Sequence, residues 1–298
     1  MMQPEARREF HVAGSVFAAP KLPAGLYLVA TPIGNLGDIS IRALQTLAAA
    51  DLVACEDTRV SRKLLSHYGI AAALALYHEH NAQEARPKLL ARIAEGAAVA
   101  LISDAGTPLI SDPGFKLVRE AVGEGLPIHV VPGASAVMAG LAIAGLPTDR
   151  FYFAGFLPVR AGERRSMLAE LKSLRATLVF FESAQRLADS LGDIASVLGV
   201  RTAAVGREMT KMHEEMRRGL VQDLADHYAK AGAPKGEVTL LISPPHDEEV
   251  DFTRVDALLD MALPFMPLRA AVDLVADAMG AHRRDVYERA LAKKKDDD

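Results

Sequence analysis

Short apolar runs alternate with amphipathic stretches along most of this chain, beginning at Leu26. The runs 52–55, 98–102 and 128–131 are almost continuously apolar, which is typical of strands buried on both faces of a parallel sheet. Between them, stretches such as 81–94 place their apolar residues on one helical face. The pattern predicts an α/β fold whose mostly parallel or mixed sheets are covered by helices.

The alternation pauses at residues 145–150 (GLPTDR) and then starts again. We therefore expect two α/β domains, an N-terminal one over 24–147 and a C-terminal one over 148–245, with a cofactor cleft between them. Expected strands are 26–30, 52–55, 73–77, 98–102, 128–131, 151–156, 177–181, 202–205 and 237–242, with 214–220 as an antiparallel edge strand. Expected helices are 40–50, 60–68, 81–94, 114–122, 164–174, 184–198 and 221–230, with Ser40 capping the first.

Both ends of the chain differ from this pattern. Residues 1–23 mix charge, Pro and Gly without an apolar core, so we expect a disordered leader. The Pro-rich and acidic segment 243–251 is typical of a linker. After it, residues 252–298 predict a small helical domain with helices over 255–263, 268–279 and 283–292, in a helix-turn-helix outline. Packing and nucleic-acid contact remain alternative roles for this tail.

Composition narrows the class of protein. The 298 residues carry a net charge of −4, so contact with RNA or DNA requires a local basic face. The single cysteine excludes an internal disulfide and fits a reducing compartment. The segment 134–146 is too short to span a bilayer, and we expect a cytoplasmic protein with no membrane role. Basic residues that form either solvated faces or a phosphate-binding rim are Arg59, Arg62, Lys63, Arg160, Arg164, Arg165, Arg217 and Arg218.

Two loops point most directly to chemistry: SDAGTPLISDPG (103–114) and VPGASA (131–136). Each follows an apolar strand and leads into a helix, so both belong at the carboxyl edge of the sheet, where open α/β sheets bind ligands. Their small side chains leave backbone groups accessible to a nucleotide-like cofactor. The loop 30–40 lacks the first glycine of G-x-G-x-x-G, but Glu56 at the end of the second strand keeps a dinucleotide-binding oxidoreductase open as an alternative.

Taken together, the loops resemble the tetrapyrrole-methylase-like family of S-adenosylmethionine methyltransferases. The blocks that carry the resemblance are LYLVATPIGNLGDIS, ACEDTRVSRKLL, YHEHN, LISDAGTPLISDPG, VPGASA, FAGFLP, VFFESAQRL, VGREMTKMHEE and KGEVTLLI. They are most similar to bacterial enzymes that methylate a cytidine ribose 2′-hydroxyl in small-subunit ribosomal RNA. Porphyrin-type members have G-x-G-P-G-D and G-G-D-P where this chain has TPIGNLGD and DAGTP, which favours RNA over a tetrapyrrole, the alternative substrate.

The resemblance also implies site residues, a homodimer, and ribosomal RNA or the small ribosomal subunit as partner. The residues that would contact S-adenosyl-L-methionine are Pro32, Gly34, Ala105, Gly106, Thr107, Ile110, Ser135, Ala136, Glu182 and Met209. The candidate substrate-binding residues are Arg59, His80, Asn81 and Arg186. An apolar face such as 141–146 would serve either the dimer or the core.

Methyl transfer from a sulfonium is a direct displacement, so it requires alignment above all. A ribose hydroxyl is a weak nucleophile near neutral pH, so a base should help to remove its proton. Lys211 and Glu182 are our first candidates, followed by Glu208 and Asp57. The alternative for the two glutamates is an ion pair, Glu182 with Arg186 and Glu208 with Arg207.

His78 and His80 would share one face of a strand, an arrangement that could hold a metal. Neither a cysteine nor a second His or carboxylate set completes a tetrahedral site near them, so we expect no metal.

Overall fold

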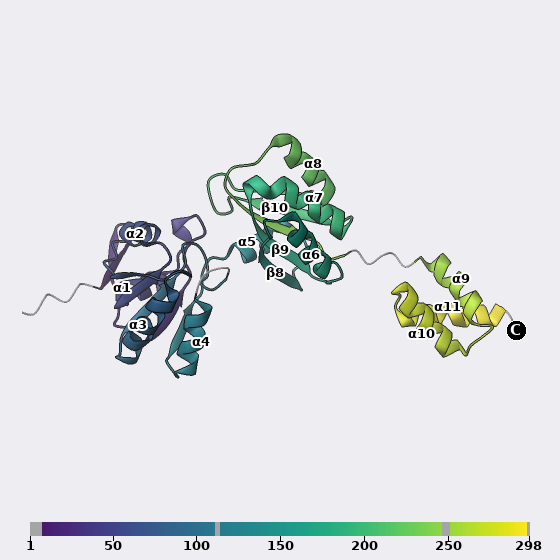
Figure 1. Ribbon diagram of the computed structural model, residues 1–298, viewed down its shortest axis with the longest axis horizontal. Helices are drawn as coiled ribbons and strands as arrows, with labels where there is room; N and C mark the ends of the chain where they lie inside the picture. The colour runs from purple at the N-terminus through teal and green to yellow at the C-terminus, as the bar shows by residue number, and fades with distance from the viewer. Residues whose placement is uncertain (1–7, 111–113, 246–250, 297–298) are drawn as a thin grey trace, which may run out of the picture. The chain divides into compact units, whose positions relative to one another are not determined.

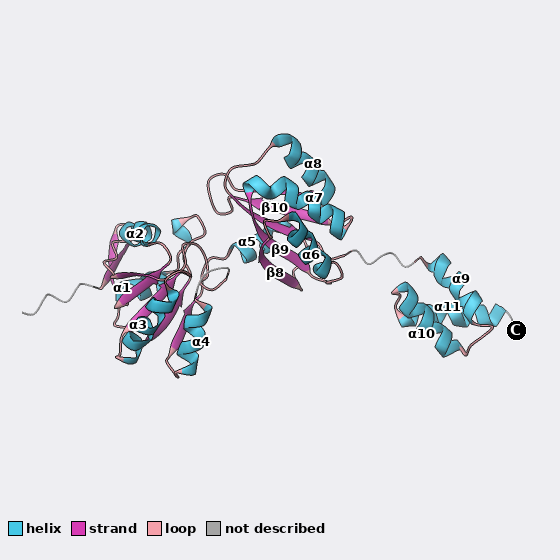
Figure 2. Cartoon of the chain, in the orientation of Figure 1, coloured by secondary structure: helices cyan, strands magenta, loops and turns pink. Residues whose placement is uncertain are grey.

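The computed structural model describes residues 8–110, 114–245 and 251–296. Contacts divide the chain into two compact units, and the boundary in the sequence lies between Ser243 and Pro244. The first unit contains two five-stranded sheets with their helices, and the second contains three helices (Figures 1 and 2). The α/β class that the hydrophobic pattern predicts is confirmed.

The first sheet is entirely parallel, in the order β5-β4-β6-β3-β7. Its strands are β3 (Gly25–Val29), β4 (Leu52–Cys55), β5 (Leu74–Leu76), β6 (Ala98–Ile102) and β7 (Ile128–Val131). Its helices are α1 (Ile41–Ala49), α2 (Thr58–His67), α3 (Ala82–Ala94) and α4 (Phe115–Gly123). Ser40 caps α1 as expected, its side chain accepting from the N–H of Ala43 at 3.0 Å. A short 3-10 turn, η1 (Leu36–Asp38), lies in the loop after β3.

Alternate residues of these strands face opposite cores, which explains their continuous apolar sequences. Val53 and Ala100 pack with α1 and α2, whereas Ala54, Val99 and Leu101 pack with α3 and α4. Both faces are covered, so only the strand ends remain free to form a site.

The second sheet is mixed, in the order β11-β10-β12-β9-β8. Its strands are β8 (Phe151–Phe156), β9 (Thr177–Ser183), β10 (Thr202–Arg207), β11 (Glu215–Leu220) and β12 (Glu237–Ile242). Only β8 and β9 pair in parallel, and β11 is an antiparallel edge strand, as the sequence predicts. One face is covered by α6 (Ala161–Leu171), α7 (Leu187–Leu198) and α8 (Val221–Ala231), and the turn η2 (Ala184–Arg186) precedes α7.

The other face of this sheet is covered by α5 (Ala136–Ala144), the helix that follows β7. Leu141 and Ala144 are buried there against Val179 and Leu241. The expected boundary at 147/148 assigned this helix to the first domain, whereas its packing joins it to the second sheet. Leu141 therefore serves the core, one of the two roles that the sequence allows for this segment.

The expectation of a disordered leader over 1–23 is wrong for its described part. Strands β1 (Glu9–Val12) and β2 (Ser15–Ala18) form an antiparallel hairpin. Phe10 is buried and stacks on Phe17, and the N–H of His11 donates to the carbonyl of Tyr68 at 2.7 Å. The hairpin is fixed by the buried ring of Phe10 and by this hydrogen bond to the C-terminal end of α2. So few buried residues give no hydrophobic periodicity that could be seen in the sequence. Residues 1–7 lie outside the described part.

The second unit is a three-helix domain of α9 (Phe252–Ala262), α10 (Leu268–Met279) and α11 (Arg283–Asp296). Val255, Leu259, Val272 and Val286 form its separate core. The linker residues 246–250 and the terminal 297–298 lie outside the described residues. No helix in the described ranges is long and apolar enough to cross a membrane.

Candidate active site

The loop after β6 is fixed against the end of β3. The Thr31 hydroxyl donates to the Ser103 carbonyl at 3.1 Å, and Thr31 forms a backbone bridge with Gly106. Ser103 Oγ donates to the Gly106 carbonyl at 3.0 Å. Gly106 has φ +83, and a Cβ there would lie 3.3 Å from Ile33 Cγ2. A glycine is therefore required where the loop turns toward the ligand side.

The second predicted loop lies directly beside the first. Thr107 Oγ1 donates to the Ala134 carbonyl at 3.4 Å, and Ser135 caps α5 by accepting from the N–H of Met138 at 3.4 Å. The two short-chained loops thus present backbone groups to one space, as the sequence predicts.

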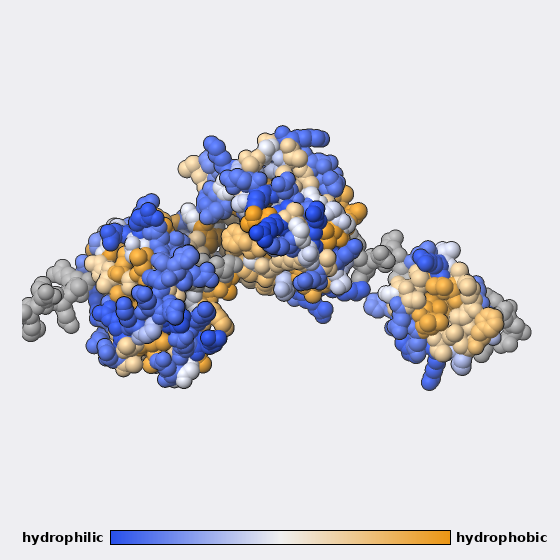
Figure 3. All heavy atoms as spheres, viewed as in Figure 1, coloured by the Kyte–Doolittle hydropathy of each residue, from blue (hydrophilic) through white to orange (hydrophobic). Residues whose placement is uncertain are grey.

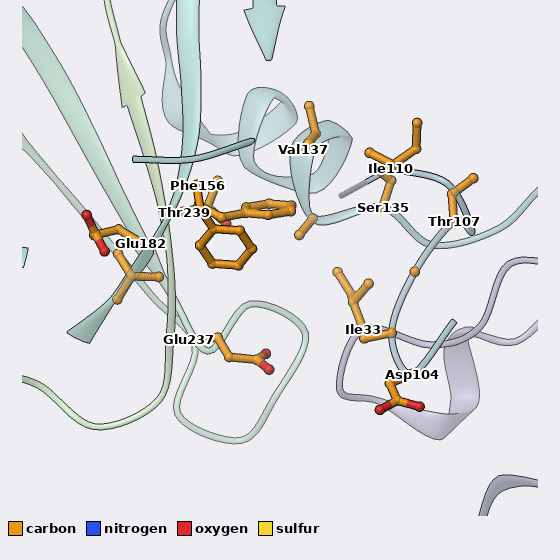
Figure 4. Close-up of a pocket in the computed structure, with 15 residues that line it drawn as sticks. Ile33, Asp104, Thr107, Ile110, Ser135, Val137, Phe156, Glu182, Glu237 and Thr239 are labelled. Carbon is orange, nitrogen blue, oxygen red and sulfur yellow. The ribbon is translucent and has the colours of Figure 1, made fainter. Parts of the chain in front are cut away.

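That space is a pocket of about 260 Å³, which we call the main pocket (Figure 4). Figure 4 shows the loops with Ile33, Thr107 and Ser135 on one side, and Phe156, Thr239 and Glu182 on the other. The expected cofactor residues that line it are Ala105, Gly106, Thr107, Ile110, Ser135, Ala136 and Glu182. The lining residues that the sequence interpretation missed are Ile33, Asp104, Val137, Phe156, Phe181, Glu237, Val238 and Thr239. Most of these belong to the second sheet, which no local motif connects to the loops.

A second pocket of about 280 Å³, which we call the side pocket, adjoins the first. Ile33, Asp104, Ala105 and Glu237 line both. The expected residues Pro32, Gly34 and Lys211 line the side pocket together with Lys63, whereas Met209 lines neither pocket. Met209 is buried beneath its own loop, near Gly206. Each pocket alone is slightly smaller than a usual small-molecule site, and only the two adjoining volumes taken together fall within the usual range of about 300–1,000 Å³.

Lys211 joins two carboxylates at the edge of the side pocket. Its Nζ donates to Glu208 Oε1 at 2.8 Å and to Glu237 Oε2 at 2.9 Å. Burial lowers the pKa of Lys211, but the hydrogen bonds to Glu208 and Glu237 outweigh this, and the pKa is raised overall. The hydrogen bond from Lys211 holds the pKa of Glu208 below its usual range. At neutral pH Lys211 is therefore a cation with no lone pair to accept a proton, and Glu208 is engaged with it rather than with Arg207.

Gly34 meets this lysine from the first domain. Its φ is +142, and a Cβ there would lie 2.3 Å from Lys211 Cε and 2.6 Å from Cγ. A glycine is therefore needed at position 34 because any larger residue would overlap the aliphatic stem of Lys211. This need accounts for Gly34, so the residue is not evidence for a dinucleotide-binding motif.

Glu182 forms the ion pair that is the alternative to a catalytic role. Its side chain is 0% exposed, and Arg186 lies 2.5 Å from Oε1. The Ser183 N–H donates to Oε1 and Ser190 Oγ donates to Oε2, each at 2.6 Å. Arg186 also donates to the Leu157 carbonyl at 3.2 Å. Both Glu182 oxygens and most Arg186 donors are engaged within the second domain.

Carboxylates also gather at the end of β4. Asp57 caps α2 and binds Arg59, whose hydrogen bonds lower the pKa of Asp57 to about 2. Asp104 accepts one hydrogen bond, from the Asp57 N–H at 3.3 Å. Burial, assisted by the charge of Asp104, raises the pKa of Glu56. Burial also raises the pKa of Asp104, and the charge of Asp57 acts in the same direction.

The remaining candidate substrate-binding residues, Arg59, Asn81 and His80, line neither pocket. Arg59 is largely exposed and paired with Asp57. Asn81 shapes the turn before α3, accepting from the His78 N–H at 2.8 Å and donating to the Leu76 carbonyl at 2.9 Å. His80 is exposed, and its ring centroid lies 5.9 Å from that of His78. Within the described ranges no group of three or more His, Cys, Asp or Glu side chains is placed to hold a metal.

Several of the basic residues are engaged by the protein itself. Arg164 and Arg165 pair with Asp193, Arg217 pairs with Glu215, and Arg218 donates to carbonyls at the end of α5. By contrast, Arg62 and Lys63 are exposed on α2, and neither forms an ion pair with any other described side chain. The basic surface nearest the pockets is therefore that of α2.

Comparison with known proteins agrees with this architecture. Residues 25–225 match the family of Tetrapyrrole (Corrin/Porphyrin) Methylases, and residues 249–294 match the RsmI C-terminal HTH domain. The chain is 54% identical over 278 residues to the Ribosomal RNA small subunit methyltransferase I of Mesorhizobium japonicum, covering 93% of this chain and 94% of the relative.

Solved structures share the fold at lower identity. Cobalt precorrin-4 methyltransferase, a cobalamin biosynthetic enzyme, aligns with TM-score 0.55 and 23% identity over 73% of this chain and 94% of its own. Uroporphyrin-III C-methyltransferase from Thermus thermophilus, complexed with S-adenosyl homocysteine, aligns with TM-score 0.50 and 21% identity over 73% and 96%. With its two α/β sheets, its loop-lined pocket and its helical tail, the chain belongs to the tetrapyrrole methylase family and groups there with the ribosomal RNA small subunit methyltransferases I.

Proposed function

We propose that this protein transfers a methyl group from S-adenosyl-L-methionine to a cytidine ribose 2′-oxygen in small-subunit ribosomal RNA. The observation that carries the proposal is the main pocket, in which the two predicted loops meet the second sheet. The high identity to ribosomal RNA methyltransferases over nearly the whole chain supports RNA rather than a tetrapyrrole as substrate. A ribosomal RNA substrate implies a cytoplasmic enzyme.

The pocket residues suit this cofactor. Backbone at Ala105 and Ser135, which line the main pocket and are not buried, offers hydrogen bonds to a nucleoside and an amino acid group. Asp104 and the ring of Phe156, which is 59% exposed, provide a carboxylate and an aromatic surface, both favourable to a sulfonium cation. The dinucleotide alternative lacks equivalent support, because Gly34 makes room for Lys211 rather than for a pyrophosphate.

S-adenosyl-L-methionine supplies an electrophilic methyl group on sulfur. The protein's own part is chiefly to orient the methyl donor and the RNA. The loops hold the donor in the main pocket, and the side pocket leaves room for the acceptor ribose. Alignment of this kind supplies roughly 7–11 kcal/mol of a barrier. Lys211, held as a cation by Glu208 and Glu237, fits a role in binding the RNA backbone near the side pocket rather than in taking a proton.

The RNA footprint we propose begins on α2. Arg62 and Lys63 are exposed on α2, where Lys63 lines the side pocket and Arg59 lies one turn earlier, and His80 is exposed on the turn before α3. Phosphate neutralisation by such residues makes binding fall steeply with added salt. RNA binding that does not weaken as salt is added would contradict this placement.

We also propose a homodimer. Two edge strands, β7 and β8, and the adjacent α4 expose Val130, Phe115, Val122 and Phe151, each more than 40% accessible. Figure 3 shows apolar residues along the margin of the first domain where Figure 1 places α4. Exposed apolar edges of this kind are commonly covered by a second subunit.

The function is tested by mapping ribose methylation in ribosomal RNA, by mass spectrometry, from cells with and without this protein. Loss of one 2′-O-methylcytidine from the small-subunit RNA is the expected result, restored by the wild-type gene. The variant Gly106→Val should fail to restore it and should not bind S-adenosylhomocysteine in calorimetry, because the added side chain meets Ile33 beside the main pocket. Gly96→Val is the matched control, since Gly96 also has positive φ but a Cβ added there would have no atom within 4 Å. Identical methylation maps with and without the protein would refute the substrate.

A further inference from the structure

We propose that Asp104 is the group that accepts the proton from the acceptor hydroxyl during methyl transfer. The inference rests on the proposed function and adds to it the residue that activates the nucleophile. The supporting observation is placement: Asp104 lines both the main pocket and the side pocket, at the junction where a bound donor and an acceptor would meet.

The other carboxylates and the lysine of the site are committed elsewhere. Glu182 has both oxygens engaged by Arg186, Ser183 and Ser190. Lys211 is held as a cation, and Glu208 Oε1 accepts from Lys211 and from the Glu237 N–H at 3.0 Å. Glu182 and Lys211 therefore have no free acceptor atom for a ligand proton at neutral pH, and Glu208 lines neither pocket.

Two further acids near this junction are Asp57, whose N–H donates to Asp104, and Glu237, which lines both pockets. Asp57 is fixed by Arg59 through hydrogen bonds to both of its oxygens, and that pairing lowers its pKa to about 2, so it is a weak base. Glu237 lines both pockets, but its Oε2 accepts from Lys211 at 2.9 Å. Asp104, by contrast, accepts one long hydrogen bond, at 3.3 Å, and is an exposed residue that lines both pockets. Figure 4 shows Asp104 below Ile33 on the loop side of the main pocket and Glu237 on the opposite side.

The local environment favours this role. The charged or titratable groups around Asp104 are Cys55, Glu56 and Asp57 at the end of β4, Lys63 on α2, and Lys211 and Glu237 from the second domain. Partial desolvation of the carboxyl, with the charge of Asp57, raises the pKa of Asp104 above its usual 3.8. A base whose pKa lies closer to neutral accepts a proton more effectively while remaining ionised at pH 7.

The step balances without a further reactant. The ribose 2′-oxygen bonds to the methyl carbon as the carbon–sulfur bond breaks, and the bonding pair remains on sulfur as a neutral thioether. The hydroxyl proton passes to the Asp104 carboxylate and from there to solvent.

The test compares Asp104→Asn with Glu237→Gln, an isosteric change at the other acid shared by both pockets. Three quantities are measured for each: S-adenosylhomocysteine affinity by calorimetry, RNA affinity by filter binding, and the single-turnover methyl-transfer rate from pH 4 to 9. Wild type should lose rate on the acidic side, tenfold per pH unit below the pKa of the base. Asp104→Asn should bind both ligands within about threefold of wild type and lose roughly 10²–10⁴ in rate, together with that acidic limb. Glu237→Gln should still show the acidic fall in methyl-transfer rate. Asp104→Glu should also show it, with a lower rate overall.

Each other outcome overturns the assignment. If the Asp104→Asn enzyme still loses methyl-transfer rate at acidic pH as wild type does, another group accepts the proton. A variant that no longer binds S-adenosylhomocysteine makes Asp104 a cofactor ligand instead. Wild-type protein that methylates no ribosomal RNA refutes the proposed function, and this role with it, whereas an active wild type with an unaltered variant refutes the Asp104 role alone.

Discussion

The contact between Gly34 and the stem of Lys211 gives a prediction that can be worked out in detail. In Gly34→Ala, the new methyl would lie 2.3, 2.6 and 2.9 Å from three carbons of the lysine. Because the whole stem is involved, a shift of the side-chain tip cannot relieve the overlap. Lys211 must leave its position, and its hydrogen bonds to Glu208 and Glu237 are then lost.

Two contributions to the destabilisation can be estimated. An alanine at φ +142 costs about 1–2 kcal/mol of backbone strain. The lysine's side chain is 25% exposed and Glu237 is 76% exposed, so solvent screens the ion pairs and their loss adds only about 1 kcal/mol. The free energy of unfolding should therefore fall by roughly 2–3 kcal/mol.

Gly96→Ala separates these contributions, because Gly96 has φ +101 and no atom within 4 Å of the added methyl. It should cost the strain alone, about 1–2 kcal/mol. Combining Gly34→Ala with Lys211→Ala removes the overlap, so the double variant should be more stable than the sum of the single changes by about 1 kcal/mol.

The assay is urea unfolding followed by circular dichroism, with single-turnover methyl transfer measured on wild type, the three single variants Gly34→Ala, Gly96→Ala and Lys211→Ala, and the double variant. Gly34→Ala should also transfer methyl groups more slowly than Gly96→Ala, since only the former disturbs the side pocket. Strictly additive effects of the two changes would refute the steric coupling between Gly34 and Lys211.

Three further predictions concern other parts of the structure. Glu182→Ala should lower the free energy of unfolding by about 3–5 kcal/mol, because it leaves Arg186 partly buried without its carboxylate; a loss below about 1 kcal/mol in urea titrations would contradict the ion pair. The lowered pKa of Glu208 stabilises the fold above its unfolded value of 4.5, and this contribution is lost as pH falls through the folded pKa. Below pH 4.5, wild type should therefore lose stability more steeply than Glu208→Gln, as measured by thermal midpoints, and parallel curves would count against it. Finally, Val130→Lys on the exposed edge strand should convert the proposed dimer to a monomer in light scattering, with S-adenosylhomocysteine affinity retained, and an unchanged mass would exclude this edge as the interface.

The strand positions were predictable because buried parallel strands require continuous apolar sequence. The runs 52–55, 98–102 and 128–131 match β4, β6 and β7 residue for residue. The β1–β2 hairpin was missed because its eight strand residues bury chiefly one ring, Phe10. Too little apolar surface is involved to produce a visible period.

The site was more predictable on the first-domain side than on the second, where Glu182 and Lys211 are the expected residues that line a pocket. Loops rich in small residues indicate backbone that a ligand can approach, and 105–107 and 135–136 do line the main pocket. The opposite wall, with Phe156 and Thr239, depends on how the second sheet faces those loops, which no local pattern encodes. The pairing of Lys211 with Glu237, 26 residues away, is equally a property of the folded chain.

The route of the chain through α5 has a consequence for how this enzyme can be divided. The polypeptide leaves the first sheet at β7, lines the main pocket at Ser135 and Ala136, and then becomes part of the core beneath the second sheet. A cut at 145–150, where the sequence suggests a natural border, would leave one fragment with an unshielded apolar helix and the other with a bare sheet face. Neither fragment would keep the ligand-lining turn anchored, so two-piece versions of this protein should reassemble only where α5 stays on the same fragment as its sheet.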